Sequence, residues 1–429
     1  MLFIRKFERI KQSTMKGLQS KKYYPWVLVA LLWVVALLNY MDRQMLSTMK
    51  SAMEIHILEL QKAEAFGFLM AIFLYIYGVM SPIAGVIADR TNRKWLIIGS
   101  LFVWSAVTYA MGEANTLNEL LILRGIMGIS EALYIPTALA LIADYHPKKT
   151  RSLAIGIHMT GLYMGQALGG FGATIASSYG WHKAFHWFGI TGMVYSVILM
   201  LFLFESRSGA KENNKAKGVP LTKIPLSKGL TQLFSTTVFW VILFYFAAPS
   251  LPGWAIKNWI PTLFSDNLNI PMAQAGPMST ITIAVSSFLG VLIGGVMSDK
   301  WVDKNIKGRI YTSAIGLGLT IPSLVLLGFG STVFAVVGAA VLFGIGFGMF
   351  DTNNMPILCQ FVPSRLRATA YGFMNMMGVF AGAAITQVLG RFKDQGNFGF
   401  GFAILAVFVL FAIVLQLKVL KPQVNDFKD

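Results

Sequence analysis

The sequence is poor in charge and nearly free of cysteine. Only 13% of its 429 residues are charged, whereas a soluble domain has about 25%, and 55% are hydrophobic. Cys359 is the single cysteine, which excludes an intramolecular disulfide and a thiol-based metal site. The sequence also has no recognisable phosphate-binding loop, metal-ligand cluster or catalytic constellation. We therefore expect neither an enzyme nor a cofactor.

Long hydrophobic runs make up most of the chain instead. About twelve of them are long enough to cross a bilayer of roughly 30 Å as helices. They lack the period-two alternation of a membrane β-barrel. The expected spans are residues 24–48, 65–88, 95–112, 118–144, 151–177, 184–205, 235–264, 273–299, 309–329, 333–361, 366–390 and 398–419. The sequence thus predicts an all-α polytopic membrane protein with twelve transmembrane helices.

The net charge of +17 is distributed as a topology signal. Lysine and arginine precede the first span, follow the even-numbered spans, and fill a long polar linker. The opposite side has only Lys50, Lys62, Lys183, Arg391 and Lys393. Since basic loops stay in the cytoplasm, both termini and the linker are expected there, as in a multi-pass plasma membrane protein of the bacterial inner-membrane type. The excess charge favours contact with anionic membrane lipid, and its distribution argues against nucleic acid.

The linker divides the chain into two halves that echo each other. The expected parts are a basic cytoplasmic N-terminus (1–23), a six-helix bundle (24–205), a cytoplasmic linker (206–232), a second six-helix bundle (233–420) and a tail (421–429). The string at Gly85 to Arg90, after the second span, recurs at Gly295 to Lys300, after the eighth. Two parallel halves with a substrate site near the bilayer midplane form a known transporter plan.

The loop after the second span carries a family resemblance. Gly85 to Trp95 reads G-x-x-x-D-R-x-x-R-K-x and resembles the loop signature of the major facilitator superfamily, with Asn92 where that family has glycine. The resemblance implies two pseudo-symmetric six-helix bundles. It also implies a cytoplasmic latch formed by Asp89 and Arg93, with Asp299 as the counterpart in the second half. The alternative is a solvated loop whose charge only sets topology.

Four ionisable residues lie inside apolar spans of the first half: Asp42, Arg43, Arg124 and Glu131. Such residues are rare in membranes and usually mark an ion or substrate path. Asp42 and Arg43 are adjacent and point about 100° apart on a helix, so each needs partners on other helices. Burial favours a neutral acid and a nearby arginine favours an ionised one, so such an acid can switch with protonation. The alternative is a permanent salt-bridge network that fixes helix packing.

The strings N-Y-x-D-R, ending at Arg43, and R-x-x-x-G-x-x-E, from Arg124 to Glu131, resemble the anion:cation symporter family. That family includes hexuronate, galactonate and sialic acid transporters and sialin-type carriers. The resemblance implies that Asp42 and Glu131 bind protons and that Arg43 and Arg124 serve the anion. The same N-Y-M-D-R string also occurs in Spinster-type lipid carriers. Further candidate substrate ligands in or beside the matching spans are Tyr75, Tyr134, Tyr163, Gln166 and Asn375.

The second half adds polar residues within its spans. Lys257 follows a Pro252-Gly253 break and would clamp a carboxylate if it faced the cavity, or would reach the outer headgroups if it did not. Asn353 and Asn354 could bond sugar hydroxyls or hold helices together. Asp351 fits either a second titrating site or a packing acid, and the sequence does not separate the two.

These features predict a secondary active transporter that moves a small organic anion together with protons. A sugar acid such as a hexuronate, an aldonate or sialic acid is the expected substrate, because acids paired with arginines accompany tyrosines and amides. One alternative is a Spinster-like carrier of lysolipid or another amphiphile. Another is an organic phosphate antiporter that uses Arg43 and Lys257. We expect a monomer in contact with membrane lipid.

Overall fold

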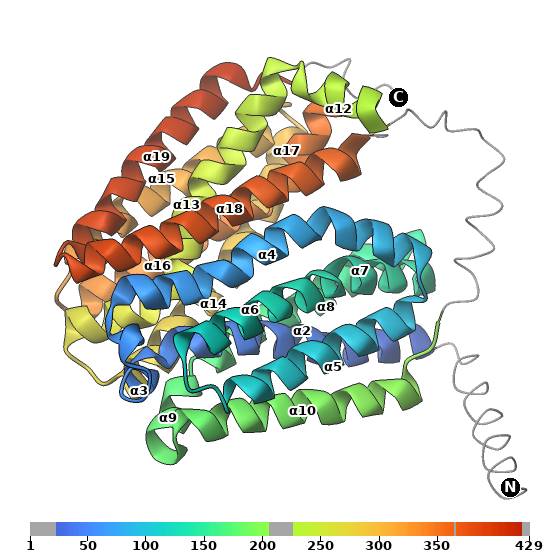
Figure 1. Cartoon of the computed structure of the whole chain (residues 1–429). Coiled ribbons are helices and arrows are strands. Elements are labelled where there is room, and N and C mark those ends of the chain that lie inside the picture. The colour runs from blue at the N-terminus through green and yellow to red at the C-terminus, as the bar shows by residue number, and fades with distance from the viewer. Residues whose placement is uncertain (1–22, 206–225, 364–365, 423–429) are drawn as a thin grey trace, which may run out of the picture.

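The computed structural model describes residues 23–205, 226–363 and 366–422, and helices account for nearly all of this part (Figure 1). The first half contains α2 (Tyr24–Thr48), α3 (Lys50–Met53), η1 (Leu58–Gln61), α4 (Ala63–Arg90), α5 (Arg93–Met111), α6 (Leu117–Ala132), α7 (Tyr134–Tyr145), α8 (Lys148–Gly169), α9 (Gly172–Tyr179) and α10 (Trp181–Phe202). The second half contains α12 (Leu226–Phe234), α13 (Thr237–Leu268), α14 (Met272–Val302), α15 (Gly308–Phe329), α16 (Val333–Asp351), α17 (Asn354–Phe361), α18 (Arg367–Asp394) and α19 (Phe398–Val419).

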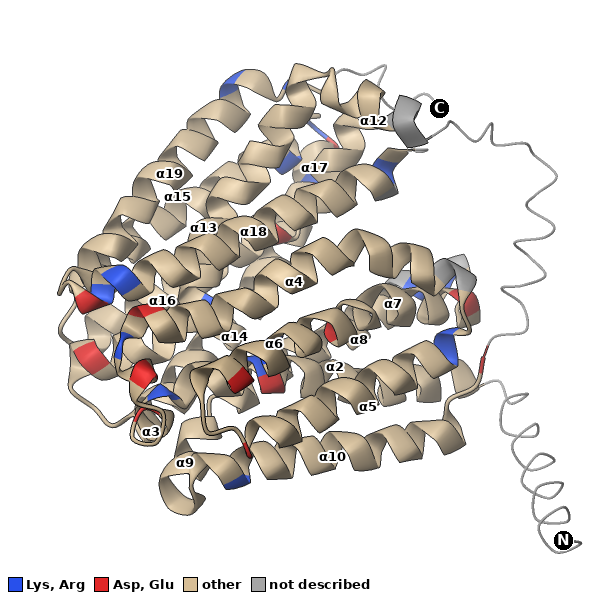
Figure 2. Cartoon of the chain, viewed as in Figure 1, with Lys and Arg blue, Asp and Glu red and all other residues tan. Residues whose placement is uncertain are grey.

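The helices match the predicted spans to within a few residues. Among the described residues, eleven helical segments are long and apolar enough to cross a membrane. The remaining predicted span, the fifth, corresponds to α8 and α9, and α8 is more polar because it carries His158 and Gln166 between its apolar residues. Figure 2 shows that charged residues gather toward the helix ends and leave most of their length uncharged.

The helices form two groups that meet along a long seam. In the first half α2 packs on α8, α5 on α10 and α4 on α6; in the second, α16 packs on α14 and α15, and α13 on α18. The two groups touch mainly where α4 lies beside α18, in the middle of Figure 1, and where α8 and α9 lie beside α14. The described helices thus follow the predicted two-bundle plan. The predicted N-terminus, most of the linker and most of the tail lie outside the described residues.

Contacts between the groups concentrate at one end of the molecule, which we call the closed end: it is where α4 begins and α18 finishes. The backbone N–H groups of Ala63 and Glu64 donate to the Asp394 carboxylate at 2.7 and 2.9 Å, so α18 caps α4 across the seam. Arg391 Nε pairs with Glu64 Oε1 at 2.6 Å. The opposite end, where α4 finishes, is called the open end below.

Three predicted spans are broken rather than continuous. The span at 118–144 divides into α6 and α7 at Leu133, the span at 151–177 divides into α8 and α9 at Gly170 and Phe171, and the span at 333–361 divides into α16 and α17 at Thr352 and Asn353. Pro136 and Pro356 explain the first and the last of these breaks, because proline has no N–H to donate and its ring clashes with the carbonyl four residues earlier. The expectation of one helix for each span was wrong at these three points.

Close packing of α8 on α2 depends on glycine, which provides a stability test. A Cβ added at Gly165 would lie 2.2 Å from the Leu37 carbonyl oxygen, whereas one added at Gly156, on the same helix, would meet nothing within 4 Å. Overpacking of this kind costs about 1–3 kcal/mol. Gly165→Ala should therefore lower the melting temperature of the purified protein. Gly156→Ala, the control, should leave it unchanged or raised, since alanine favours helix; equal effects would contradict the packing.

Candidate functional site

A cavity of about 1000 Å³ lies between the two halves, roughly midway along the helices. Its walls come from α2, α4, α7 and α8 on one side and from α13, α14, α16, α17 and α18 on the other. Toward the open end it is bordered by Gly85 on α4 and Leu153 on α8. Toward the closed end the halves seal it, since Gln44 on α2 donates to the Lys257 carbonyl at 3.0 Å. The two halves therefore contact each other on the closed-end side of the cavity.

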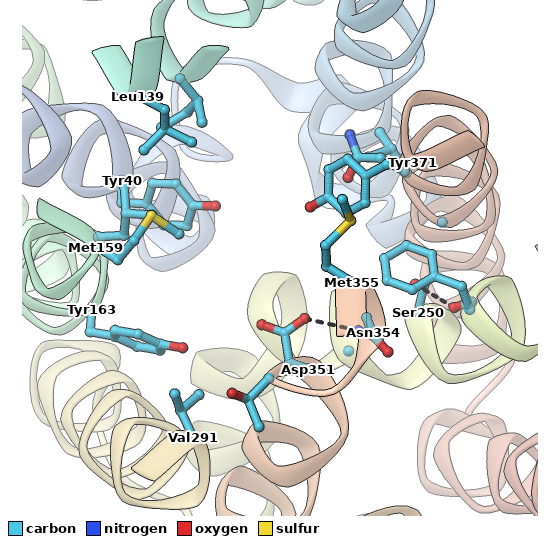
Figure 3. A pocket seen from close by; sticks show the side chains of 18 of the residues that line it. Tyr40, Leu139, Met159, Tyr163, Ser250, Val291, Asp351, Asn354, Met355 and Tyr371 are labelled. Carbon is cyan, nitrogen blue, oxygen red and sulfur yellow. Dashed lines mark hydrogen bonds between the residues drawn. The ribbon is translucent and has the colours of Figure 1, made fainter. Parts of the chain in front are cut away.

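The second half provides the polar wall of the cavity. Asp351, the last residue of α16, exposes its carboxylate to the open space (Figure 3). Asn354 Nδ2 donates to Asp351 Oδ1 at 3.3 Å, and the Tyr245 hydroxyl donates to Asn354 Oδ1 at 3.2 Å. Lys257 also lines the cavity, with its ammonium 4.9 Å from the centre of the Trp254 ring. A cation, an acid and an amide thus face the same space.

The first half provides an aromatic wall. Tyr40 on α2, Tyr77 on α4 and Tyr163 on α8 line the cavity. Tyr40 and Tyr163 face the polar wall across the open space in Figure 3. Such rings offer an apolar face with a hydroxyl at the edge, which suits an amphipathic ligand.

The charged core predicted in the first half lies behind this aromatic wall. Arg43 Nε pairs with Glu131 Oε2 at 2.5 Å, and the Glu131 side chain is fully buried. The guanidinium of Arg43 sits 4.7–5.0 Å from the ring centres of Tyr40, Phe73 and Tyr77. The pair is thus enclosed by three aromatic rings, two of which also line the cavity.

Asp42 and Arg124 complete this core without an ion pair of their own among the described residues. Asp42 is 5% exposed, and its nearest hydrogen-bonding partner is the Thr108 hydroxyl, at 3.5 Å from Oδ2. Arg124 lies 4.5 Å from the Phe73 ring centre, so both arginines contact that ring. Burial of an unpaired carboxylate costs free energy. In this conformation no ion pair among the described residues stabilises a negative charge on Asp42.

The structure separates the predicted substrate ligands into two groups. Tyr163, Lys257, Asn354 and Asn375 line the cavity. The others lie away from its wall in this conformation, and their role as ligands stays a prediction: Arg43, Arg124, Tyr75, Tyr134, Gln166 and Asn353.

Local bonding explains why several of these side chains turn away. The Tyr134 hydroxyl donates to the Leu32 carbonyl at 2.7 Å, and Asn353 Nδ2 donates to the Met349 carbonyl at 2.8 Å. Tyr75 packs against Phe380 of α18, with ring centres 6.2 Å apart. Each therefore joins helices or satisfies backbone groups within the bundle.

The predicted latch residues form ion pairs within one half. Arg93 pairs with Asp144 of α7, and Arg309 Nη2 pairs with Asp299 Oδ1 at 3.2 Å. The side chain of Asp89 lies outside the described residues. Neither described pair joins the two halves at the open end, so in this conformation the latch stays a prediction.

The sequence reasoning missed three of the tyrosines that line the cavity: Tyr40, Tyr77 and Tyr371. For Tyr40 a signal existed, because it precedes Arg43 by three residues and so shares its helix face. For Tyr77 and Tyr371, which lie on α4 and α18, one sequence offers no comparable signal.

Comparison with known proteins identifies the family. A model of the Major Facilitator Superfamily matches residues 32–387. The chain belongs to this superfamily. It is a transporter and not an enzyme, and it is similar in sequence, at low identity, to carriers of sugar acids.

Two curated relatives and one solved structure are similar to this major facilitator. It is 26% identical to the hexuronate transporter of Bacillus subtilis over 94% of this chain and 96% of the relative. It is 26% identical to the D-galactonate transporter of Escherichia coli O6:H1 over 90% of this chain and 92% of the relative. A bacterial homologue of the lysosomal transporter Spinster, in an inward-facing and unoccupied conformation, has a TM-score of 0.77 at 19% identity over 96% of this chain and all of that structure. The last similarity concerns the fold alone.

Cysteine labelling can test which residues of this transporter line the cavity. In a Cys359→Ser background, Asn375→Cys should react with a water-soluble thiol reagent, because Asn375 lines the cavity. Asn353→Cys should react much more slowly, because Asn353 is fully buried. Mass spectrometry of the labelled protein measures both rates. Similar rates would show that the two positions are placed wrongly relative to the cavity.

Proposed function

We propose that this major facilitator is a proton-coupled symporter of a sugar acid and works by alternating access. The observation that carries the proposal is the enclosed Arg43–Glu131 ion pair beside the unpaired Asp42, set directly behind the cavity wall. The polar wall across the cavity supports the choice of substrate, since Lys257 suits a carboxylate and Asn354 and Asn375 suit hydroxyls. The sugar-acid relatives point to the same substrate class.

The ion pair supplies a physical route from protonation to substrate binding. While Glu131 is ionised, its carboxylate holds the Arg43 guanidinium at 2.5 Å inside the aromatic cage. A proton on Glu131 removes that charge and leaves Arg43 a buried cation in need of an anion. Tyr40 and Tyr77 both contact Arg43 and line the cavity, so movement of these rings would open the guanidinium to a bound carboxylate.

The distribution of basic residues supports one orientation of the protein in the membrane. The open end is the end at which Arg93 and Lys94 begin α5, and basic loops favour the cytoplasm. On that orientation the cavity faces inward and the closed end faces outward. The Arg43–Glu131 ion pair requires an ionised Glu131, so in the proposed cycle this inward-facing state follows release of the proton from Glu131.

Uptake into proteoliposomes tests the proposal. The purified protein is given an inward proton gradient and offered glucuronate, galactonate, sialic acid, lysolipid or glycerol phosphate. Accumulation of a sugar acid that a protonophore collapses is the expected result. Transport of lysolipid alone, or phosphate exchange insensitive to the gradient, would replace the proposal with one of the alternative functions.

Substitution of Asp42 tests proton coupling directly. Asp42→Asn keeps the size of the side chain but cannot gain or lose a proton, so accumulation should fall to the level of downhill equilibration. Exchange of labelled for unlabelled substrate at equal pH should continue. Glu113→Gln, which removes an exposed acid between α5 and α6, is the control. Gradient-driven accumulation at the wild-type level in Asp42→Asn would remove Asp42 from the mechanism.

Substitution of Lys257 tests anion binding. Lys257→Gln should weaken the affinity for the sugar acid by about tenfold or more, since a hydrogen bond to a charged group contributes about 1.5–3 kcal/mol. Lys183→Gln, on the exposed side of α10, removes the same charge away from the cavity. Concentration dependence of uptake gives both affinities. An unchanged affinity in Lys257→Gln would exclude it as the carboxylate ligand.

A further inference from the structure

The fourth span of each half is broken in the same way. In the first half Glu131 stands five residues before Pro136, and in the second Asp351 stands five residues before Pro356. Each acid lies within the last two residues of the helix that precedes the break, α6 or α16. Asp351 is therefore the positional counterpart of Glu131, which argues against an incidental packing acid.

The first span of each half supplies a matching cation. Arg43 lies on α2 and pairs with Glu131, the acid of its own half, while Lys257 lies on α13 and lines the same cavity as Asp351. The two pairs differ in whether the cation and the acid are bonded to each other. Arg43 and Glu131 are bonded to each other behind the aromatic wall, whereas Lys257 and Asp351 both line the cavity without forming an ion pair. The second half thus presents both charges to whatever occupies the cavity.

Asp351 is held as a fixed acceptor. Its Oδ1 accepts from Asn354, and Asn354 is itself held by Tyr245, whose hydroxyl also contacts Ser313 Oγ at 2.7 Å. The carboxylate projects into the open space between the walls (Figure 3). Among the described residues that line the cavity, Lys257 is the only cation and Asp351 the only carboxylate.

We propose that Asp351 is the specificity-determining residue of this cavity and selects sugar monocarboxylates over sugar dicarboxylates. Lys257, joined by Arg43 once its cage opens, binds the single carboxylate, while Asp351 accepts hydrogen bonds from hydroxyl groups farther along the chain of the sugar. A dicarboxylate brings a second anion toward Asp351, the carboxylate of the opposite part of the site, and like charges placed together disfavour binding. This inference rests on the proposed function and narrows its substrate class to hexuronates and aldonates, away from aldarates.

Competition against labelled substrate tests the selectivity. Wild-type protein in proteoliposomes takes up labelled galactonate or glucuronate while unlabelled galactonate, glucuronate, galactarate or glucarate competes. Galactarate and glucarate should compete at least about tenfold more weakly than the two monocarboxylates. In Asp351→Asn that gap should close, because the amide keeps the shape and removes the charge. Glu59→Gln, which neutralises an exposed acid on η1, should keep the gap.

The outcomes separate this inference from the function on which it rests. Equal competition by monocarboxylates and dicarboxylates in the wild type would overturn the role of Asp351 and leave sugar-acid symport standing. A gap that persists in Asp351→Asn would assign the selectivity to another residue. Asp351→Ser repeats the test with a smaller neutral side chain if the asparagine variant does not fold. Failure of every sugar acid to be taken up or to compete would overturn both proposals.

Discussion

The cost of placing charge inside a membrane protein governs the arrangement of the first half. Glu131 has no exposed surface, and its only ion-pair partner among the described residues is Arg43. Removal of one member of such a pair typically costs about 3–5 kcal/mol, because the other is left as an unpaired buried charge. The cage of Tyr40, Phe73 and Tyr77 adds cation–π contacts that compensate for lost water. In the proposed mechanism, a single proton on Glu131 would leave the buried Arg43 cation without its partner, and this would link protonation to a rearrangement of the neighbouring helices.

The contacts at the closed end are suited to separation. The Glu64–Arg391 side chains are 40% and 55% exposed, and exposed ion pairs stabilise by only about 0–1 kcal/mol. Close approach of backbones adds to this: a Cβ at Gly170 would lie 2.0 Å from Thr280 Oγ1, and one at Gly390 would lie 2.4 Å from the Ala63 carbonyl. Small residues thus let the helices approach closely at this end, and the exposed ion pair contributes little to holding them together.

Much of the architecture could be predicted from the sequence, whereas the direction of individual side chains could not. Hydrophobic length determines the spans, and for that reason their boundaries agree to within a few residues. Helical periodicity correctly puts Glu131 and Tyr134 on one face, and both contact α2. One sequence does not say whether that face looks into the cavity or into the bundle, since this depends on which helices are neighbours. The break after α16 also separates two adjacent amides: Asn353 lies in the break and donates to the Met349 carbonyl, whereas Asn354 begins α17 and lines the cavity.

The difference between the two charge pairs originates in the residues that form them. Arginine presents a planar fork that stacks on aromatic rings and matches a carboxylate, so Arg43 suits a buried carboxylate partner inside an aromatic cage. Lysine is a compact point charge on a flexible stem, so Lys257 can turn from its own half toward a passing anion. Two enclosed pairs would leave the cavity with no charge to bind a substrate. If both pairs were open, Glu131 would face the cavity, and its protonation would no longer determine where Arg43 lies. In the proposed mechanism, the enclosed pair therefore serves proton coupling in the first half and the open pair serves substrate recognition in the second, and movement of the halves would bring the two together.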